Sequence, residues 1–210
     1  MGEIVLRKLT GADFKRALDG LARLRIEIFR EWPYLYDGDL DYERRYLSKF
    51  AMSKDAVIIG AYDGDKLVGA ATASPLIDHA DEFASPFRKA GLDPEEFFYF
   101  AEFLMLKPHR RQGIGARFFD EMEQVAQDAG FHKIAFCTVV RPADHPAKPD
   151  DAIPIDGFCR RHGYRPVDGL ICDFPWRDLG DAEETHKPMQ VWVREFTAAA
   201  QPPAQPQSKS

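Results

Sequence analysis

The chain contains little cysteine and no long apolar run. Its three cysteines, Cys137, Cys159 and Cys172, have the spacing of neither a disulfide framework nor a paired zinc motif, so we expect reduced thiols and no metal site. No apolar stretch approaches the ~20 residues that a membrane-spanning helix requires. The amino terminus has no signal-like pattern. We therefore expect a cytoplasmic protein that does not enter a membrane.

An excess of basic residues is also missing. The net charge of −6 disfavours binding to nucleic acid or to anionic membranes, because both need a basic face. A chain of 210 residues can bury one sizeable core, so we expect a single domain over residues 1–197. Residues 198–210 are rich in Ala, Pro, Gln and Ser, a composition that favours a disordered tail.

The glycine-containing segment 110–116 lacks the marks of the common nucleotide loops. No Lys-Ser or Lys-Thr follows Gly115, as a Walker loop would require, and Phe118 stands where the dinucleotide fingerprint has its third glycine. These differences argue against a nucleotide-binding enzyme that uses this loop.

What this segment does have is its place between an apolar run, Phe97 to Leu106, and an amphipathic helical pattern that ends near Ala129. A helix that begins after two glycines presents unpaired N–H groups and the positive end of its dipole. Phosphate groups bind at such a place. The predicted anion cradle consists of Arg110, Arg111, Gln112, Gly113, Ile114, Gly115 and Ala116.

The hydrophobic periodicity predicts an alternation of strands and helices along the chain. Strands are expected at residues 4–8, 57–62, 67–74, 97–106, 133–140, 170–176 and 189–196. Helices are expected at residues 13–30 and 40–50, from the glycine turn to 129, and at 156–162. The irregular segment from Asp78 to Glu96 is long enough to contain a helical turn of its own.

The spacing Arg-x-x-Gly-x-Gly at Arg110, Gly113 and Gly115 resembles motif A of the GNAT acyltransferase superfamily, and the order of elements is similar to that superfamily over nearly the whole chain. The resemblance implies an α/β GNAT fold, with a mixed, mostly antiparallel central sheet of about seven strands flanked by about four helices. It also implies acetyl-CoA as co-substrate, its pyrophosphate in the cradle. The backbone of Leu104, Met105 and Leu106 would then run beside the pantetheine arm and polarise the thioester carbonyl.

Glu102 is the candidate catalytic base. It is the only acid within the apolar strand before the cradle, and acyl transfer to an amine requires a group that removes the proton of the ammonium. In many GNAT enzymes a Glu on this strand has that role. The alternative is a Glu102 that faces solvent at the sheet edge or pairs with an arginine.

The general acid is where the chain departs from the superfamily pattern. Many members carry a Tyr in a segment that corresponds to residues 158–164 here, and Cys159 takes its position. The ordinary interpretation of Cys159 is a buried structural thiol. Tyr164, a residue of the proline-rich loop, or no dedicated acid at all are the alternatives.

Substrate recognition is expected in irregular segments set on the rigid fold. Trp32, Tyr34 and Tyr36 stand among carboxylates, which suits a cationic or amphipathic amine, although a packed turn is an equal interpretation. His145, in the loop from Arg141 to Pro149, is a further candidate for a substrate contact, or an inert surface histidine.

The resemblance therefore implies an acetyl-CoA-dependent N-acetyltransferase that acts on a small amine by direct attack in a ternary complex. The alternative is a catalytically inactive acyl-CoA-binding sensor or interaction module with the same fold. The aromatic run, the long loop and residues 176–189 together resemble a bacterial subgroup of the superfamily without an assigned substrate. Pairing into a homodimer is common in the superfamily and is expected to be possible here.

Overall fold

The computed structural model describes residues 2–79 and 81–196. The strands are β1 (Ile4–Lys8), β2 (Val57–Asp63), β3 (Lys66–Pro75), β4 (Phe97–Met105), β5 (Lys133–Val139), β6 (Arg165–Trp176) and β7 (Thr185–Glu195). The helices are α1 (Gly11–Phe29), α2 (Leu40–Phe50), α3 (Asp81–Lys89), α4 (Ile114–Asp128) and α5 (Asp156–Arg161). The predicted disordered tail, residues 198–210, lies outside the described residues.

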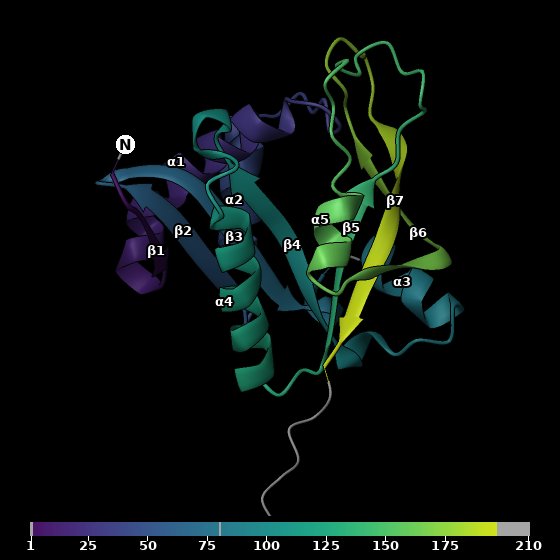
Figure 1. The fold of residues 1–210 in the computed structure, drawn as a ribbon, viewed down its shortest axis with the longest axis horizontal. Coiled ribbons are helices and arrows are strands. Elements are labelled where there is room, and N and C mark those ends of the chain that lie inside the picture. The colour runs from purple at the N-terminus through teal and green to yellow at the C-terminus, as the bar shows by residue number, and fades with distance from the viewer. Residues whose placement is uncertain (1, 80, 197–210) are drawn as a thin grey trace, which may run out of the picture.

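The seven strands form one sheet in the order β1-β2-β3-β4-β5-β7-β6 (Figure 1). Every neighbouring pair is antiparallel except β4 and β5, which run parallel. The mixed, mostly antiparallel sheet expected from the sequence is thereby confirmed.

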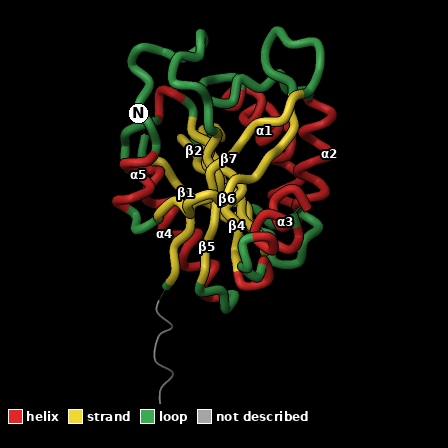
Figure 2. Tube along the Cα trace, turned by 90° about the vertical axis from the view of Figure 1, so that its right-hand side faces the viewer, coloured by secondary structure: helices red, strands yellow, loops and turns green. Residues whose placement is uncertain are grey.

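Helices cover both faces of the sheet (Figure 2). On one face, α1 and α2 pack through Leu21 and Leu47 against Ile58 of β2, and α3 packs through Phe87. On the other face, α4 packs through Met122, and α5 lies beside it. Because successive side chains of a strand point to opposite faces, β2, β3, β4, β5 and β7 each contribute to the cores on both faces.

The hairpin between β2 and β3 shows how the local sequence sets the register. Asp63 pairs with Lys66, so Gly64 and Asp65 form a two-residue loop, and Gly64 has a φ of 61°. Loops of this length favour left-handed backbone, which glycine adopts without strain. The predicted turn at Gly64 is confirmed.

Three segments differ from the expectation in extent, and one of them is β7, which begins at Thr185, four residues before the predicted start. The segment from Asp78 to Glu96 contains the nine-residue helix α3 rather than a single turn. Strand β6 begins at Arg165, five residues before the predicted start, and its register against β7 shifts between Pro166 and Ile171. Proline and glycine in this stretch indicate a turn, whereas the chain uses them in an irregularity within the strand.

Strands β4 and β5 pair only at their beginnings and then separate. Phe97 to Tyr99 pair with Lys133 to Ala135, and the pairing ends there, while β5 continues beside β7 as far as Val139. The two strands diverge towards the carboxyl end of β4, where α4 begins (Figure 1). One edge of β4 is therefore free of strand pairing over its second half.

Candidate active site

A β-bulge in β4 decides which way Glu102 points. Ala73 pairs with Phe100 and Thr72 pairs with Glu102, so Ala101 is an extra residue on β4. An extra residue reverses the alternation of side chains that follow it. Without the bulge, Glu102 would point to the same face as Phe100, into the hydrophobic core between the sheet and α4, here called the α4 core. With it, Glu102 lines a cavity on the opposite face, together with Ala101.

The main chain of β4 offers donors to the gap between β4 and β5. The N–H of Leu106 donates to Val68 of β3 at 2.9 Å, and alternation turns Leu104 to the same side. Alternation turns the N–H groups of Phe103 and Met105 towards the gap, and the Met105 carbonyl accepts a bond from Arg110. Of Leu104, Met105 and Leu106, whose backbone was predicted to contact the pantetheine arm, Met105 has its N–H and carbonyl groups on this edge. Phe103 is an additional candidate.

The first turn of α4 has the features of an anion cradle. It follows Gly113, whose φ is 78°, and within the described chain no side chain caps the helix. A Cβ at Gly113 would have no described atom within 4 Å, so the space beside this glycine is open. The first turn therefore fits a phosphate group, because backbone N–H groups and the helix dipole both favour one there.

Arg110 connects the cradle to its surroundings. Its guanidinium pairs with Glu31 at 2.7 and 3.1 Å and donates to the Met105 carbonyl at 2.8 Å. The Gln112 side chain donates to the Pro108 carbonyl at 3.2 Å, which supports the turn before α4. These contacts hold the end of β4, the cradle and the loop after α1 together.

A cavity of about 420 Å³ lies on the face covered by α1, α2 and α3. Nine of its lining residues are Phe, Tyr or Trp: Phe29, Tyr34, Tyr36, Tyr42, Tyr46, Phe83, Tyr99, Phe174 and Trp176. Its charged lining residues are Arg25, Asp37, Asp39, Glu102, Arg177 and Glu184. Tyr34 and Tyr36, both predicted from the sequence, belong to this wall. A wall of aromatic rings and carboxylates is suited to an amphipathic cation.

A buried charge cluster forms one end of the cavity. Arg25 of α1 pairs with Glu43 of α2 and with Glu102 of β4, and the exposed fractions are 7%, 0% and 7%. The Arg25 guanidinium also lies 4.2 Å from the ring centroid of Tyr46. Two carboxylates share one guanidinium, so the cluster has a net negative charge. Oε2 of Glu102 has no hydrogen-bond partner among the described residues.

The other two predicted substrate residues lie apart from the cavity lining. The rings of Trp32 and His145 contact each other at a tilt of 53°, with centroids 5.2 Å apart, and His145 accepts a hydrogen bond from the Ala147 amide. Nearby, Arg141 donates to the carbonyls of Pro33 and Tyr34 and pairs with Asp178. These contacts connect the loop after α1 with the loop that begins at Arg141, and they fix the rim of the cavity.

Neither residue considered as the general acid points into the cavity. The Cys159 side chain lies in the α4 core, and burial raises the pKa of its thiol to about 12. The Tyr164 hydroxyl donates to Glu123 at 2.9 Å in the same core, where the residue is 2% exposed. Burial and the neighbouring carboxylate of Glu123 raise the pKa of this phenol far above its usual range.

His79, Arg25 and Glu43 are site residues that the sequence did not single out. His79 follows β3 in the irregular segment, lines the cavity, and its Nε2 lies 2.8 Å from the Ser74 hydroxyl. Burial lowers the pKa of His79 to about 4, against a smaller opposite effect of Asp78. Arg25 and Glu43 are charged residues on the buried faces of α1 and α2, where their neighbours include Leu21 and Leu47, and this charge on an apolar face is the sequence signal that could have found them.

Replacing His79 with Gln should reduce the loss of stability in mild acid. The unfolded histidine takes up a proton near pH 6.5, whereas the folded one does so only near pH 4, so stability falls as pH falls through this window. This difference contributes about 2 kcal/mol between pH 7 and pH 5. Urea unfolding of both proteins at these two pH values measures it. His132→Gln, at an exposed position, is the control and should follow wild type.

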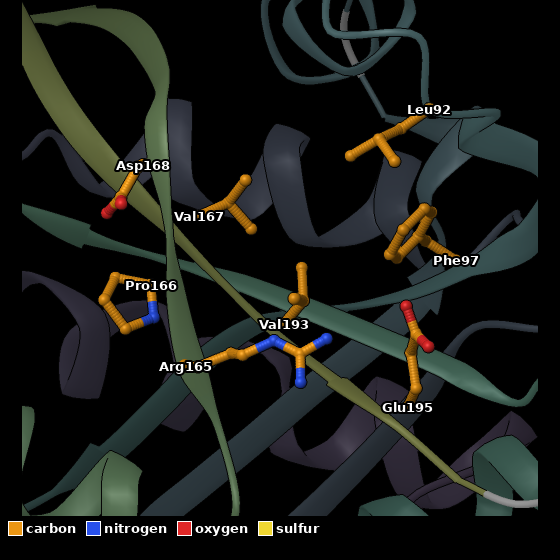
Figure 3. Close-up of a pocket in the computed structure, with 8 residues that line it drawn as sticks. All are labelled: Leu92, Phe97, Arg165, Pro166, Val167, Asp168, Val193 and Glu195. Carbon is orange, nitrogen blue, oxygen red and sulfur yellow. The ribbon is translucent and has the colours of Figure 1, made fainter.

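A second cavity, of about 330 Å³, lies near the beginning of β4 (Figure 3). Leu92, Phe97, Val167 and Val193 provide apolar lining, and Arg165, Asp168 and Glu195 are its charged residues. Phe97 is the first residue of β4, at the opposite end of the strand from the cradle. This cavity therefore lies away from the gap where β4 and β5 diverge.

Comparison with known families finds one match. The sequence model described as Acetyltransferase (GNAT) family matches residues 21–149 of this chain. None of the curated proteins matches the chain in sequence.

Solved structures with a similar fold are numerous, and three illustrate the range. The ribosomal-protein-alanine N-acetyltransferase of Brucella melitensis has 13% identity, a TM-score of 0.60, and coverage of 91% of this chain and 99% of its own. NAA60 of Arabidopsis thaliana, in complex with a bisubstrate analogue, has 15% identity, a TM-score of 0.59, and coverage of 94% and 100%. The PaiA N-acetyltransferase of Thermoplasma acidophilum, in complex with coenzyme A, has 12% identity, a TM-score of 0.53, and coverage of 92% and 99%. At these identities the similarity establishes the fold.

Membrane spans and metal clusters are the other features that bear on function. Among the helices in residues 2–79 and 81–196, none has the length and apolar content needed to cross a membrane. Within the same ranges, no group of three or more His, Cys, Asp or Glu side chains is arranged to hold a metal ion.

Proposed function

Because the chain belongs to the GNAT family of acetyltransferases, we propose that it transfers an acetyl group from acetyl-CoA to a small cationic amine by direct attack in a ternary complex. One observation carries the proposal. The buried carboxylate of Glu102 has a free oxygen, and it lies in an aromatic cavity on the strand that leads to the anion cradle.

The residues around the gap fit the co-substrate. The open first turn of α4 would hold the pyrophosphate through the backbone of Gly113, Ile114, Gly115 and Ala116, with Arg111 and Gln112 at the start of the turn. The free edge of β4 next to Met105 would take the pantetheine arm, whose amides need hydrogen-bond partners. When bound, acetyl-CoA supplies an acetyl group that is activated as a thioester.

Each group of the chain has a distinct task in the proposed transfer. Glu102 accepts a proton from the ammonium at its free oxygen, directly or through water, which leaves a neutral nitrogen. An N–C bond then forms while the C–S bond breaks, its electron pair moves to sulfur, and the nitrogen loses its second proton to solvent. The N–H groups of Phe103 and Met105 are the donors on β4 that could stabilise the charge on the carbonyl oxygen.

The cavity supports a cationic amine with an apolar or aromatic body. The Arg25 cluster is net negative, and Asp39 and Glu184 add two carboxylates to the lining. The aromatic wall, which includes Tyr34 and Tyr36, favours rings and cations through stacking and cation–π contacts. Trp32 and His145 remain predictions for a contact outside this cavity.

A panel of amines with purified protein tests the proposal. Thiol release from acetyl-CoA should rise with an aromatic amine such as 2-phenylethylamine, and less with alanine or with a neutral aromatic alcohol, because the lining favours a cation with an apolar body. Mass spectrometry of the product should show one added acetyl group on the amine. A reaction without amine measures hydrolysis and serves as the blank.

The alternative function is an acyl-CoA-binding sensor without transfer activity. The burial of Cys159 at the position of the usual tyrosine is the observation that favours it. Such a protein would gain thermal stability with increasing acetyl-CoA, yet no amine in the panel would raise thiol release above the blank. That combination of results would replace the proposed function with the alternative.

A further inference from the structure

The proposed transfer leaves negative charge on the departing sulfur, and the usual donor to that sulfur is missing. Cys159 and Tyr164 are both buried in the α4 core, and Tyr164 is bonded to Glu123. A donor from the cavity side of β4 is therefore needed if the sulfur is to be stabilised by the chain. The following inference rests on the proposed function.

Tyr99 stands at the point where β4 and β5 separate. It pairs with Ala135 in the last step of the parallel ladder, and the strands diverge from the next residue onward. Its side chain lies on the cavity face, lines the cavity beside Ala101 and Glu102, and has an exposed fraction of 3%. No other phenol of the described chain belongs to β4 or β5.

A free thiol packs in the same cluster as Tyr99. Cys137 lies on β5, two residues after Ala135 and on the same face, where alternation places it across the opening gap from Ala101. Tyr99 and Cys172 of β6 belong to the buried cluster against which Cys137 packs, and both cysteines are free thiols. The phenol therefore stands at the narrow end of the gap, with Cys137 in the packing around it.

We propose that Tyr99 is a catalytic residue whose hydroxyl donates a hydrogen bond to the sulfur of the departing coenzyme, and that Cys137 is the positioning residue whose packing orients the Tyr99 ring. As the C–S bond breaks, its electron pair moves to sulfur and the hydrogen bond strengthens. The proton stays on Tyr99. The amine loses two protons, one to Glu102 before the attack and one from nitrogen as the amide forms. Both are released to solvent, and the thiolate takes one up from solvent when it leaves.

The phenol is suited to this role over a wide pH range. Burial, together with Cys137, raises the pKa of Tyr99 well above its usual value, so the hydroxyl keeps its proton wherever the protein is folded. The cavity lining around Tyr99 contains one basic and one acidic group. The basic group is His79, whose ring centroid lies 4.8 Å from that of Tyr99, and the acidic group is Glu102. His79 is neutral at pH 7, because burial lowers its pKa to about 4, and it adds no positive charge that would ionise the phenol.

The pKa of the coenzyme A thiol in its complex tests the proposal without any amine. Coenzyme A labelled with carbon-13 beside the sulfur is titrated by NMR in the presence of saturating protein. With wild type, the bound thiol should have a lower pKa than with Tyr99→Phe, by about one pH unit, because the hydrogen bond favours the thiolate. Tyr62→Phe, which removes a phenol hydroxyl from β2, should match wild type.

Kinetics with an amine from the panel provide the second measurement. Tyr99→Phe should lower kcat roughly ten- to a hundredfold, with little change in the KM for acetyl-CoA. Cys137→Ala should raise the bound thiol pKa part of the way, because it removes packing around the Tyr99 ring, and Cys137→Ser should restore it, since serine keeps most of the bulk of cysteine. These two variants test the proposal even if Tyr99→Phe does not fold.

Equal thiol pKa values in wild type, Tyr99→Phe and Cys137→Ala would overturn the inference. Wild-type kcat in Tyr99→Phe would do the same. Failure of the proposed function gives a different result, because wild type would then bind coenzyme A without amine-dependent thiol release, or would not bind it at all.

Discussion

Glu102→Gln is expected to lower kcat by roughly a hundredfold or more, with the KM for acetyl-CoA nearly unchanged. The amide cannot accept the proton of the ammonium, whereas the cradle at the start of α4 is untouched. The fold should survive, since Arg25 and Glu43 remain as a balanced buried pair when the second carboxylate is neutral. Steady-state thiol release with the best amine of the panel, together with the melting temperature, measures both effects.

Glu43→Gln is the matched control. It removes the same charge from the same cluster and leaves Arg25 paired with Glu102, but Glu43 is fully buried behind Arg25 and does not line the cavity. Its kcat should fall far less than that of Glu102→Gln. Equal losses in the two variants would mean that only the charge of the cluster matters, and the role of Glu102 as base would have to be abandoned.

Gly113→Ala should weaken acetyl-CoA binding by roughly ten- to a hundredfold. The new Cβ would enter the open space in front of the first turn of α4, where the pyrophosphate is proposed to lie. The backbone at this position has a φ of 78°, which adds about 1 kcal/mol of strain for alanine. Isothermal titration with acetyl-CoA measures the affinity, and urea unfolding measures the strain.

Gly130→Ala separates the two effects. Gly130 has a φ of 87° and follows the other end of the same helix, and a Cβ there would also have no described atom within 4 Å. The variant should lose about the same stability as Gly113→Ala and keep wild-type affinity. If the two variants bind acetyl-CoA equally well, the cradle is not where the pyrophosphate binds.

Most of the fold could be predicted because its signals are local. The periodicity of residues 40–50 predicted α2 with the bounds that the structure has, and Asp39 caps that helix through the Tyr42 amide. The start of β6 was missed, since Pro166 and Gly169 have the same local preferences in a turn and in a strand irregularity. Local composition does not distinguish these two cases.

The candidate site was predictable only where its residues stand out within their own segment. Glu102 is the one acid in an apolar strand, and Tyr34 and Tyr36 stand in an aromatic run, so each could be named from the sequence. His79 could not, because its place in the cavity depends on segments that are distant in sequence, and Arg25 was not named, although it is a charged residue on the buried face of α1. The catalytic and binding roles of all these residues remain predictions.

The extra residue at Ala101 has a consequence for the comparison of homologues. In a relative whose fourth strand lacks this residue, an acid aligned with Glu102 would face the core beneath α4. A functional carboxylate would then have to occur one place earlier or later. A gap in the alignment of this strand would thus mean that the side chains after it point to the opposite face of the sheet. Alignments of distant family members therefore need to follow which face of the sheet each side chain of this strand points to, rather than the identity of the acid.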